Sequence, residues 1–409
     1  RRLSPFYNVR FPDGSCLAYD DDGDRLRQQI RAFNPADGPG YDRFEQASQR
    51  VFEQGFPLMT RPFPDLGAML ALAPQMLQLQ VWRSVAGFTR RFLRDPRLQQ
   101  AFSFHPLLIG GNPETSTAIY AMIHRLEQEF GIWFPEGGTG AIVDAYVRLF
   151  RELGGELRLG APVARIEVQG DRSRGVTLAS GETLPAEAVV SNADVGRTLH
   201  DLLPPGSPGR WSETDRRRRR WSMSLAVLYF GTDRRYDDVA HHEILLGDRY
   251  NDWLKDLFER GQLSEDFSLY LHRPTATDPS LAPPGCDTFY ALVPVPNLAA
   301  DLDWEQAAPL LQERLLDRLE ATLLPGLRSH LVARRWIDPR YFRDELQSYR
   351  GAAFSLQPTL FQSAAFRPHN RHPRIGNLYL VGAGTHPGAG IPGVLSSARI
   401  CADLIGDAS

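Results

Sequence analysis

The feature that most constrains this chain is a run near its C-terminal end in which an apolar stretch, a glycine-rich segment and a helix-forming segment follow one another directly. Residues 378–381 are apolar, residues 382–394 contain five glycines and two prolines, and residues 395–405 have helical character. This order predicts a buried strand, a tight loop and a helix. Glycine lets a loop backbone approach a ligand closely, and the start of the helix directs free N–H groups and a positive dipole end toward that ligand.

Such a loop suits a planar or anionic ligand. A reduced flavin carries negative charge near N1 and its C2 carbonyl, and the start of a helix stabilises that charge. We therefore interpret the segment as one wall of a flavin site. The alternative is a connection that needs only tight turns, and the number of glycines and prolines in residues 382–393 argues against it.

The rest of the chain predicts a mixture of helices and strands. A helix at 141–153 precedes four predicted strands, at 156–159, 161–169, 175–178 and 186–191, which indicates a mixed α/β domain. A later group of strands is predicted at 222–230, 267–272 and 288–295. No βαβ rhythm joins these later strands, so we expect an antiparallel sheet.

A third region, residues 66–104, is mostly helical and rich in apolar residues. It either buries its own core or docks on a membrane surface, with the arginines at 83, 90, 91 and 94 near the lipid headgroups. We expect three parts in all: a sheet domain at 1–22 and 222–340, a helical subdomain at 23–130, and a cofactor-binding remainder at 131–221 and 341–409.

Composition excludes several classes of function. The net charge of −3 gives no reason to expect a nucleic-acid partner. The cysteines at 16, 286 and 401 are widely separated, which argues against a disulfide framework, a zinc site or a dithiol redox centre. We expect no metal. The opening residues do not resemble a signal peptide, and no apolar run reaches about 18 residues. A cytoplasmic location is therefore expected.

The run 382–394 resembles the C-terminal flavin signature of the bacterial-type phytoene desaturases, carotenoid desaturases of the amine-oxidase-like flavoprotein superfamily. Other stretches resemble the same family in collinear order: 101–105 with 110–113, 133–135 with 137–140, 191–194, 267–272 and 366–370. The resemblance implies an FAD-binding, Rossmann-like α/β domain, an antiparallel-sheet substrate domain and a helical, membrane-associated subdomain. The family begins with a strand, a GxGxxG turn and a helix. We expect this chain to lack that opening and, as given, to bind FAD poorly.

The resemblance also implies roles for individual residues. The residues expected to line the isoalloxazine ring are Gly382, Gly384, Thr385, Ile391, Pro392, Gly393 and Val394. Val163 is expected to offer its backbone to the adenine, and His105 and Trp133 are expected to lie toward the substrate channel. For His105 an ordinary core position is an equal alternative. Asp65 matches a segment that carries a carboxylate in some relatives and is the candidate catalytic group, although it also suits a helix N-cap.

The implied reaction is the desaturation of phytoene to more conjugated carotenes such as lycopene, by hydride transfer from an allylic C–H bond to the flavin. The implied partners are a membrane surface and a quinone or oxygen as final electron acceptor. Three related activities remain open: a C30 desaturase, a carotenoid ketolase and a carotene isomerase. A non-catalytic flavin-fold scaffold is the alternative from another class. An amine oxidase fits less well, because the loop continues Gly384-Thr385-His386-Pro387.

Overall fold

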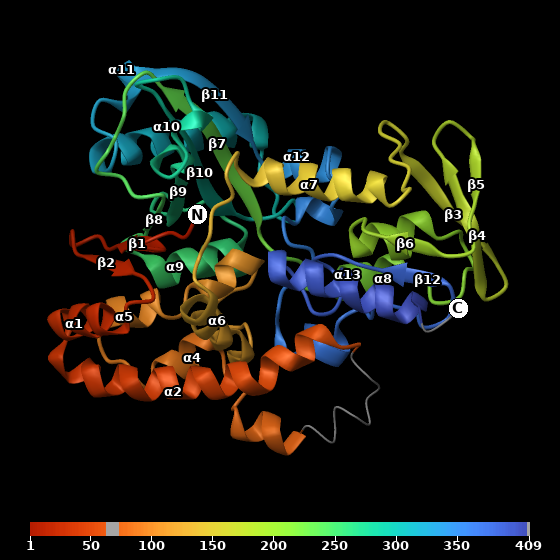
Figure 1. Cartoon of the computed structure of the whole chain (residues 1–409), viewed down its shortest axis with the longest axis horizontal. Coiled ribbons are helices and arrows are strands. Elements are labelled where there is room, and N and C mark those ends of the chain that lie inside the picture. The colour runs from red at the N-terminus through yellow and green to blue at the C-terminus, as the bar shows by residue number, and fades with distance from the viewer. Residues whose placement is uncertain (63–72, 407–409) are drawn as a thin grey trace. The chain divides into compact units, whose positions relative to one another are not determined.

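The computed structural model describes residues 1–62 and 73–406, which Figure 1 shows as ribbons. The chain forms two compact units. The sheet unit comprises residues 1–38, 126–157 and 224–341, and the loop unit comprises residues 39–125, 158–223 and 342–409. Both units combine helices and strands, so the predicted mixed α/β class is confirmed.

A seven-stranded sheet forms the centre of the sheet unit, in the order β11-β7-β10-β9-β8-β1-β2. The strands are β1 (Tyr7–Arg10), β2 (Cys16–Tyr19), β7 (Ser224–Thr232), β8 (His242–Leu245), β9 (Leu269–His272), β10 (Asp287–Val295) and β11 (Leu331–Ile337). All neighbours are antiparallel except β1 and β8, which are parallel. The three strands predicted at 222–230, 267–272 and 288–295 are confirmed as β7, β9 and β10.

The two faces of this sheet differ in exposure. Along β10 the residues alternate between buried and half-buried, with Phe289, Ala291 and Val293 in the core. Tyr290 lies on the opposite, half-open face and is the register partner of His272 on β9. This alternation is the period-2 pattern of a strand with one core face.

Helices complete the sheet unit. They are α1 (Gly23–Phe33), α7 (Thr139–Glu152), α9 (Tyr250–Lys255), α10 (Trp304–Thr322) and α11 (Leu327–His330). The longest, α10, begins at the N-cap Asp303, whose carboxylate accepts hydrogen bonds from the first-turn N–H groups. Its residues Leu311, Leu315 and Leu319 recur every four positions and are buried, so one stripe of the helix faces the core.

The loop unit contains a parallel strand pair, β6 (Val189–Ser191) with β12 (Leu378–Leu380), and an antiparallel sheet of β3 (Val163–Gln169), β4 (Arg172–Leu178) and β5 (Thr183–Pro185). Its helices are α2 (Gly38–Gly55), α4 (Val85–Thr89), α5 (Pro96–Ala101), α8 (Glu213–Arg218) and α13 (Ile391–Gly406). α2 begins one residue before the boundary between the units, and two more helices, α6 (Met122–Phe130) and α12 (Pro339–Asp344), also extend over such a boundary. The strand predicted at 156–159 is wrong: these residues form no strand, and Leu159 is 82% exposed.

The helical part of the loop unit has an aromatic core of its own. Tyr41 and Phe44 of α2 contact Phe102, with ring centroids 5.3 and 5.6 Å apart, and His124 contacts all three rings. Much of the apolar composition of this region is therefore used in packing. Among the described residues, no helix has the length and apolar content needed to cross a bilayer.

Candidate functional site

The site begins where the parallel strands β6 and β12 end. Val381 continues the ladder by donating its N–H to the Ser191 carbonyl at 3.0 Å. Asn192 follows β6 and Gly382 follows β12, so both lie at the carboxyl edge of the pair. In open α/β sheets, ligands bind outside the carboxyl ends of the strands. α13 follows the loop and lies beside the pair (Figure 1), where its Ser397 Oγ accepts the Gly382 N–H at 2.9 Å.

The glycines of the loop are required by the fold itself. A Cβ at Gly382 would lie 2.5 Å from Asn192 Oδ1, and one at Gly384 would lie 2.7 Å from Val195 Cγ1. A Cβ at Gly393 would lie 2.6 Å from the Gly388 carbonyl oxygen. Gly382 also has a φ of +101°, which L side chains rarely adopt. The sequence predicted that these glycines let the loop approach a ligand. In the structure they instead let the loop pack closely against other segments of the chain.

The first turn of α13 provides a surface that fits a flavin ring. Ile391 is 64% exposed, and Pro392 and Leu395 are also exposed at the start of this 16-residue helix. Apolar side chains here can contact the face of a planar ring, while the helix start favours negative charge. Thr385, by contrast, is buried, and its Oγ1 donates to the Gly382 carbonyl at 3.0 Å, so its side chain shapes the loop.

A buried arginine holds the loop in place. Arg367 is 2% exposed, and burial lowers the pKa of its guanidinium. The guanidinium donates to four backbone carbonyls, those of Leu356, Gln362, Ala383 and Thr385, at 3.2, 3.1, 2.5 and 3.1 Å. Two of these carbonyls belong to the glycine loop, so Arg367 fixes the conformation of the loop.

Asn370 adds a second set of restraints. Its Nδ2 donates to the carbonyl of Leu380, at the end of β12, at 3.2 Å and to that of His386 at 2.9 Å. It also reaches the Ser397 carbonyl in α13 at 3.5 Å. One amide therefore connects the strand, the loop and the helix. The stretch 366–370 was recognised as part of the family resemblance, but neither Arg367 nor Asn370 was predicted as a functional residue.

A largely apolar pocket lies against the glycine loop, within the loop unit. It encloses about 800 Å³ of empty space, part of it open to solvent. His386, Pro387 and Ala389 line it from the loop side; the other lining residues include Leu58, Met59, Met76, Leu79, Ile119 and Met122. Three of the five methionines of the chain thus line one pocket, and methionine adapts to irregular apolar ligands.

His386 brings no positive charge to this pocket at neutral pH. Burial lowers its pKa to about 4. Its Nε2 donates to the carbonyls of Leu58 and Arg61, both at 3.1 Å, which places the proton on that nitrogen. The histidine therefore connects the glycine loop to Leu58 and Arg61.

The remaining predicted site residues lie elsewhere or outside the described residues. His105 is 2% exposed and stacks on Phe104 at 4.6 Å. Trp133 belongs to the sheet unit and is 63% exposed. Val163 begins the edge strand β3, and its carbonyl accepts from Arg197 at 3.5 Å. Asp65 lies outside the described residues, so its catalytic role stays a prediction, as do the roles of the other three.

One further group near the loop was not predicted as functional. Asp194 follows β6, and burial raises the pKa of its carboxyl. Its Oδ1 accepts the N–H groups of Gly196 and Arg197 at 2.9 and 3.2 Å. Gly196 precedes the short helix 197–202, so Asp194 stabilises the turn that carries Val195 against the loop.

Comparison with known proteins identifies the family of this chain. The profile of a family described as flavin containing amine oxidoreductase matches residues 6–406. The chain belongs to this family. A lycopene-forming phytoene desaturase of Pseudescherichia vulneris is 50% identical to it over 98% of this chain and 82% of the relative. One of Pantoea ananas is 48% identical with the same coverage. The solved cyclohexylamine oxidase of Brevibacterium oxydans shares the fold, with a TM-score of 0.56, 13% identity and coverage of 100% and 82% of the two chains.

Family membership implies FAD as cofactor. The residues around the loop fit a flavin, because an apolar exposed helix start and a restrained glycine loop meet at the carboxyl edge of parallel strands. Gly382, Ile391 and Pro392 are the residues that would hold its ring. FAD, when bound there, accepts the electrons that leave the substrate. The positions of the predicted ring-lining residues around the cofactor stay a prediction.

Proposed function

We propose that this chain desaturates phytoene to lycopene, with the electrons passing to FAD. The observation that carries the proposal is the largely apolar pocket walled by His386, Pro387 and Ala389 of the glycine loop. A flavin ring held by the same loop would have this apolar space near it, which supports the proposal. The two relatives named above act, by their names, as lycopene-forming phytoene desaturases, which supports both the substrate and the product.

The pocket suits a substrate with no polar handle. Such a hydrocarbon gains affinity only from burial, at about 25 cal/mol per Å² of apolar surface removed from water. Met59, Met76 and Ile119 supply that surface. His386 stays neutral at pH 7 because its pKa is about 4. The residues of the pocket would therefore orient an allylic carbon toward the ring and exclude water from it, and the proton that completes the dehydrogenation would leave to solvent. Oxygen or a membrane quinone would reoxidise the flavin.

A charge placed in the pocket tests this assignment. Replacing Ile119 by glutamate should lower kcat/KM for phytoene in FAD-supplemented liposomes at least tenfold, because a carboxylate would have to be desolvated beside the hydrocarbon. The flavin content should stay near that of the parent protein, since Ile119 belongs to the helical turn 118–121 and is not part of the glycine loop. Chromatography and the visible spectrum of the extracted pigment measure both rate and product.

Ile119→Leu is the matched control, because it keeps apolar character and volume and should retain activity within a few fold. An Ile119→Glu enzyme as active as the leucine variant would contradict the assignment of the pocket. Neurosporene as end product would refute the lycopene assignment alone. Turnover of a C30 precursor, with phytoene untouched, would favour the C30 desaturase instead.

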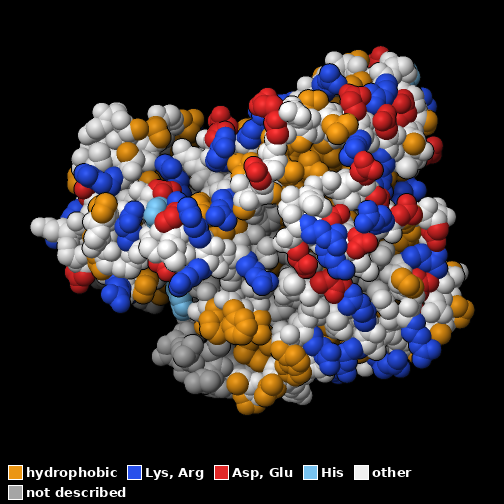
Figure 2. Space-filling view, turned by 180° about the vertical axis from the view of Figure 1, so that it is seen from behind, with side chains coloured by type: hydrophobic (Ala, Val, Ile, Leu, Met, Phe, Trp, Pro, Cys, Tyr) orange, Lys and Arg blue, Asp and Glu red, His pale blue; other side chains and the backbone are white. Residues whose placement is uncertain are grey.

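We also propose that the protein is cytoplasmic and docks on a membrane surface beside this pocket. The segments that line the pocket also expose large apolar side chains: Leu77 at 62%, Trp82 at 51% and Phe361 at 74%. Figure 2 shows hydrophobic side chains gathered near the lower edge of the face it presents, with Lys and Arg side chains beside them. An apolar surface rimmed by cations suits the boundary of an anionic bilayer, and a hydrocarbon could pass from there into the pocket.

Flotation with anionic liposomes tests the docking surface. The double variant Trp82→Asp/Phe361→Asp should lose most of the liposome-bound fraction, because two apolar anchors are replaced by charges that the lipid surface repels. Leu159→Asp is the control. Leu159 is 82% exposed but lies outside the segments that carry Trp82 and Phe361, so this variant should float like the parent protein. Equal flotation of both variants would refute the surface.

A further inference from the structure

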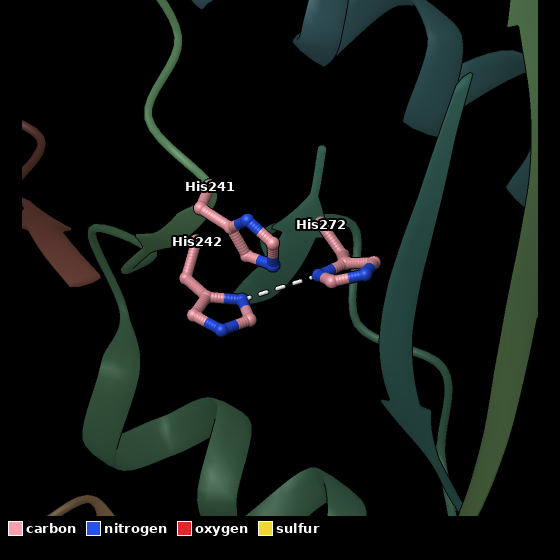
Figure 3. Close-up of side chains that lie close together, drawn as sticks. All are labelled: His241, His242 and His272. Atoms are coloured by element: carbon pink, nitrogen blue, oxygen red, sulfur yellow. Dashed lines mark hydrogen bonds between the residues drawn. The ribbon is translucent and has the colours of Figure 1, made fainter. Parts of the chain in front are cut away.

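Three histidines lie close together in the sheet unit, separate from the glycine loop in sequence and in function. His241 and His242 stand at the start of β8, and His272 ends β9. Each offers one ring nitrogen to a set in which all nitrogens lie within 4.8 Å of one another. Figure 3 shows the three rings turned toward a common point.

The strand register explains part of this convergence. His242 and His272 are direct partners in the antiparallel β8–β9 pair, so their side chains leave the sheet on the same face. That face is the half-open one that also carries Tyr290, the partner of His272 on β10. His241 joins them because its Nδ1 bonds to the Thr277 hydroxyl at 2.6 Å, which turns the other ring nitrogen toward the pair.

The ring nitrogens of this cluster do not all have a suitable hydrogen-bond partner. The Nδ1 atoms of His242 and His272 are 3.2 Å apart, and the Tyr270 hydroxyl lies 2.5 Å from the same His242 nitrogen. A ring nitrogen carries either one lone pair or one N–H, so it cannot make two strong bonds here. His241 Nε2 has no hydrogen-bond partner among the described residues, although His241 is 5% exposed. A buried polar atom without a partner calls for a specific explanation.

We propose that His241 Nε2, His242 Nδ1 and His272 Nδ1 form a binding site for a divalent transition-metal ion, with Zn²⁺ as the preferred ion. Two imidazole ligands at 2.0–2.1 Å from a tetrahedral zinc lie about 3.3 Å apart, close to the 3.2 Å between the two Nδ1 atoms. The ring nitrogen that His241 offers lies within 4.8 Å of the other two, and a shift of this side chain toward them would complete the set. The Tyr270 hydroxyl is near both Nδ1 atoms and would be available as a fourth ligand.

The protonation of the cluster suits metal binding. Burial lowers the pKa of His241 to about 4 and that of His272 to about 3, and it lowers the pKa of His242 as well. A lowered pKa favours the neutral ring, which is the form that ligates a metal. The Thr277 contact on His241 Nδ1 is the kind of outer hydrogen bond that fixes the tautomer of a ligating histidine.

The positive charge of Arg273 lies near the site and would repel a bound cation, but two carboxylates pair with it. The Arg273 guanidinium lowers the pKa of His241 in addition to burial. Arg273 is itself paired, with its Nε 2.9 Å from Asp287 and its Nη2 3.1 Å from Asp237. These two carboxylates neutralise the arginine, so the site does not carry an unbalanced positive charge. A bound ion would connect β8 to β9 on the half-open face of the sheet.

Metal titration of the chelator-treated protein tests the site. We expect one Zn²⁺ per chain by calorimetry and elemental analysis. Co²⁺ in its place should give the visible absorption of a tetrahedral nitrogen-ligated ion. Added Zn²⁺ should raise the melting temperature, because an ion that binds only the folded state stabilises it. Replacing His241 by glutamine should weaken Zn²⁺ binding at least tenfold, as should His272→Gln.

His330→Ala is the matched control: His330 belongs to the same unit but pairs with Asp233 outside the cluster, so this variant should bind Zn²⁺ like the parent protein. The two glutamine variants keep a polar side chain, and circular dichroism verifies that they are folded. A folded parent protein that binds no stoichiometric Zn²⁺ would overturn the proposal. Unchanged affinity in both folded glutamine variants would also overturn it, because binding would then reside elsewhere.

Discussion

Replacing Gly384 by valine is expected to remove bound FAD and to lower desaturase activity at least a hundredfold. The Cβ alone would lie 2.7 Å from both Val195 Cγ1 and Ser355 Oγ and 2.8 Å from Val195 Cβ. The Ser355 hydroxyl can rotate away, but Val195 is buried at 2% exposure and its Cβ moves only with the backbone. The loop must therefore shift, and a displacement of about 1 Å in a reactive geometry can change a rate by about a hundredfold.

Gly140→Ala is the matched control, because a Cβ at Gly140 in α7 meets nothing within 4 Å and alanine favours a helix. Flavin absorbance per mole of purified protein and pigment formation in liposomes are the two measurements. A Gly384→Val protein with full flavin content would show that the loop tolerates the added volume, and the role assigned to Gly384 would then be wrong.

The strand, glycine loop and helix at 378–405 could be predicted from sequence because the signals are local. An apolar stretch, a cluster of glycines and a helical pattern stand next to one another, and the structure has β12, the loop and α13 in that order. What sequence could not show is why the glycines are there. The contacts of Gly382 and Gly384 are with Asn192 and Val195, almost 200 positions away in the chain.

The restraints on the loop could not be predicted for the same reason. In the sequence nothing distinguishes Arg367 from the many other arginines of the chain. Its role follows from its burial and from its contacts with four backbone carbonyls. A signal was nevertheless present, since Arg367 and Asn370 belong to the stretch 366–370 that carried the family resemblance.

No sequence motif predicted the histidine cluster. The wide spacing of the cysteines predicts no zinc site, whereas the ligands proposed here are an adjacent pair of histidines and a third that lies 30 residues away in the chain. The pairing of β8 with β9 brings His242 and His272 together, and the contact with Thr277 turns His241 toward them. β8 was itself missed because its sequence, His-Glu-Ile-Leu, has two polar residues followed by two apolar ones and so does not alternate.

The second large effect is expected at Arg367, where methionine keeps much of the length of the side chain but removes its donors. Four backbone carbonyls, including those of Ala383 and Thr385 in the loop, would lose their partner. An unsatisfied buried polar group costs about 1–3 kcal/mol, so we expect the free energy of unfolding to fall by about 4 kcal/mol and the flavin content to fall with it. Denaturant unfolding and flavin absorbance measure the two effects.

Two further variants test whether the expected losses of stability and flavin are specific to Arg367 or follow from removing an arginine at any position. Arg371→Met removes an exposed guanidinium whose Nε donates to the Gly376 carbonyl, and surface substitutions of this kind change stability by about 0.5 kcal/mol or less. Arg367→Lys keeps the charge but has three donors in place of five, so it should retain part of the stability and part of the flavin. If Arg367→Met instead matched Arg371→Met in both measurements, the loop would not depend on this arginine. A loss of stability with full flavin content would mean that Arg367 supports the fold of the loop unit without positioning the cofactor loop.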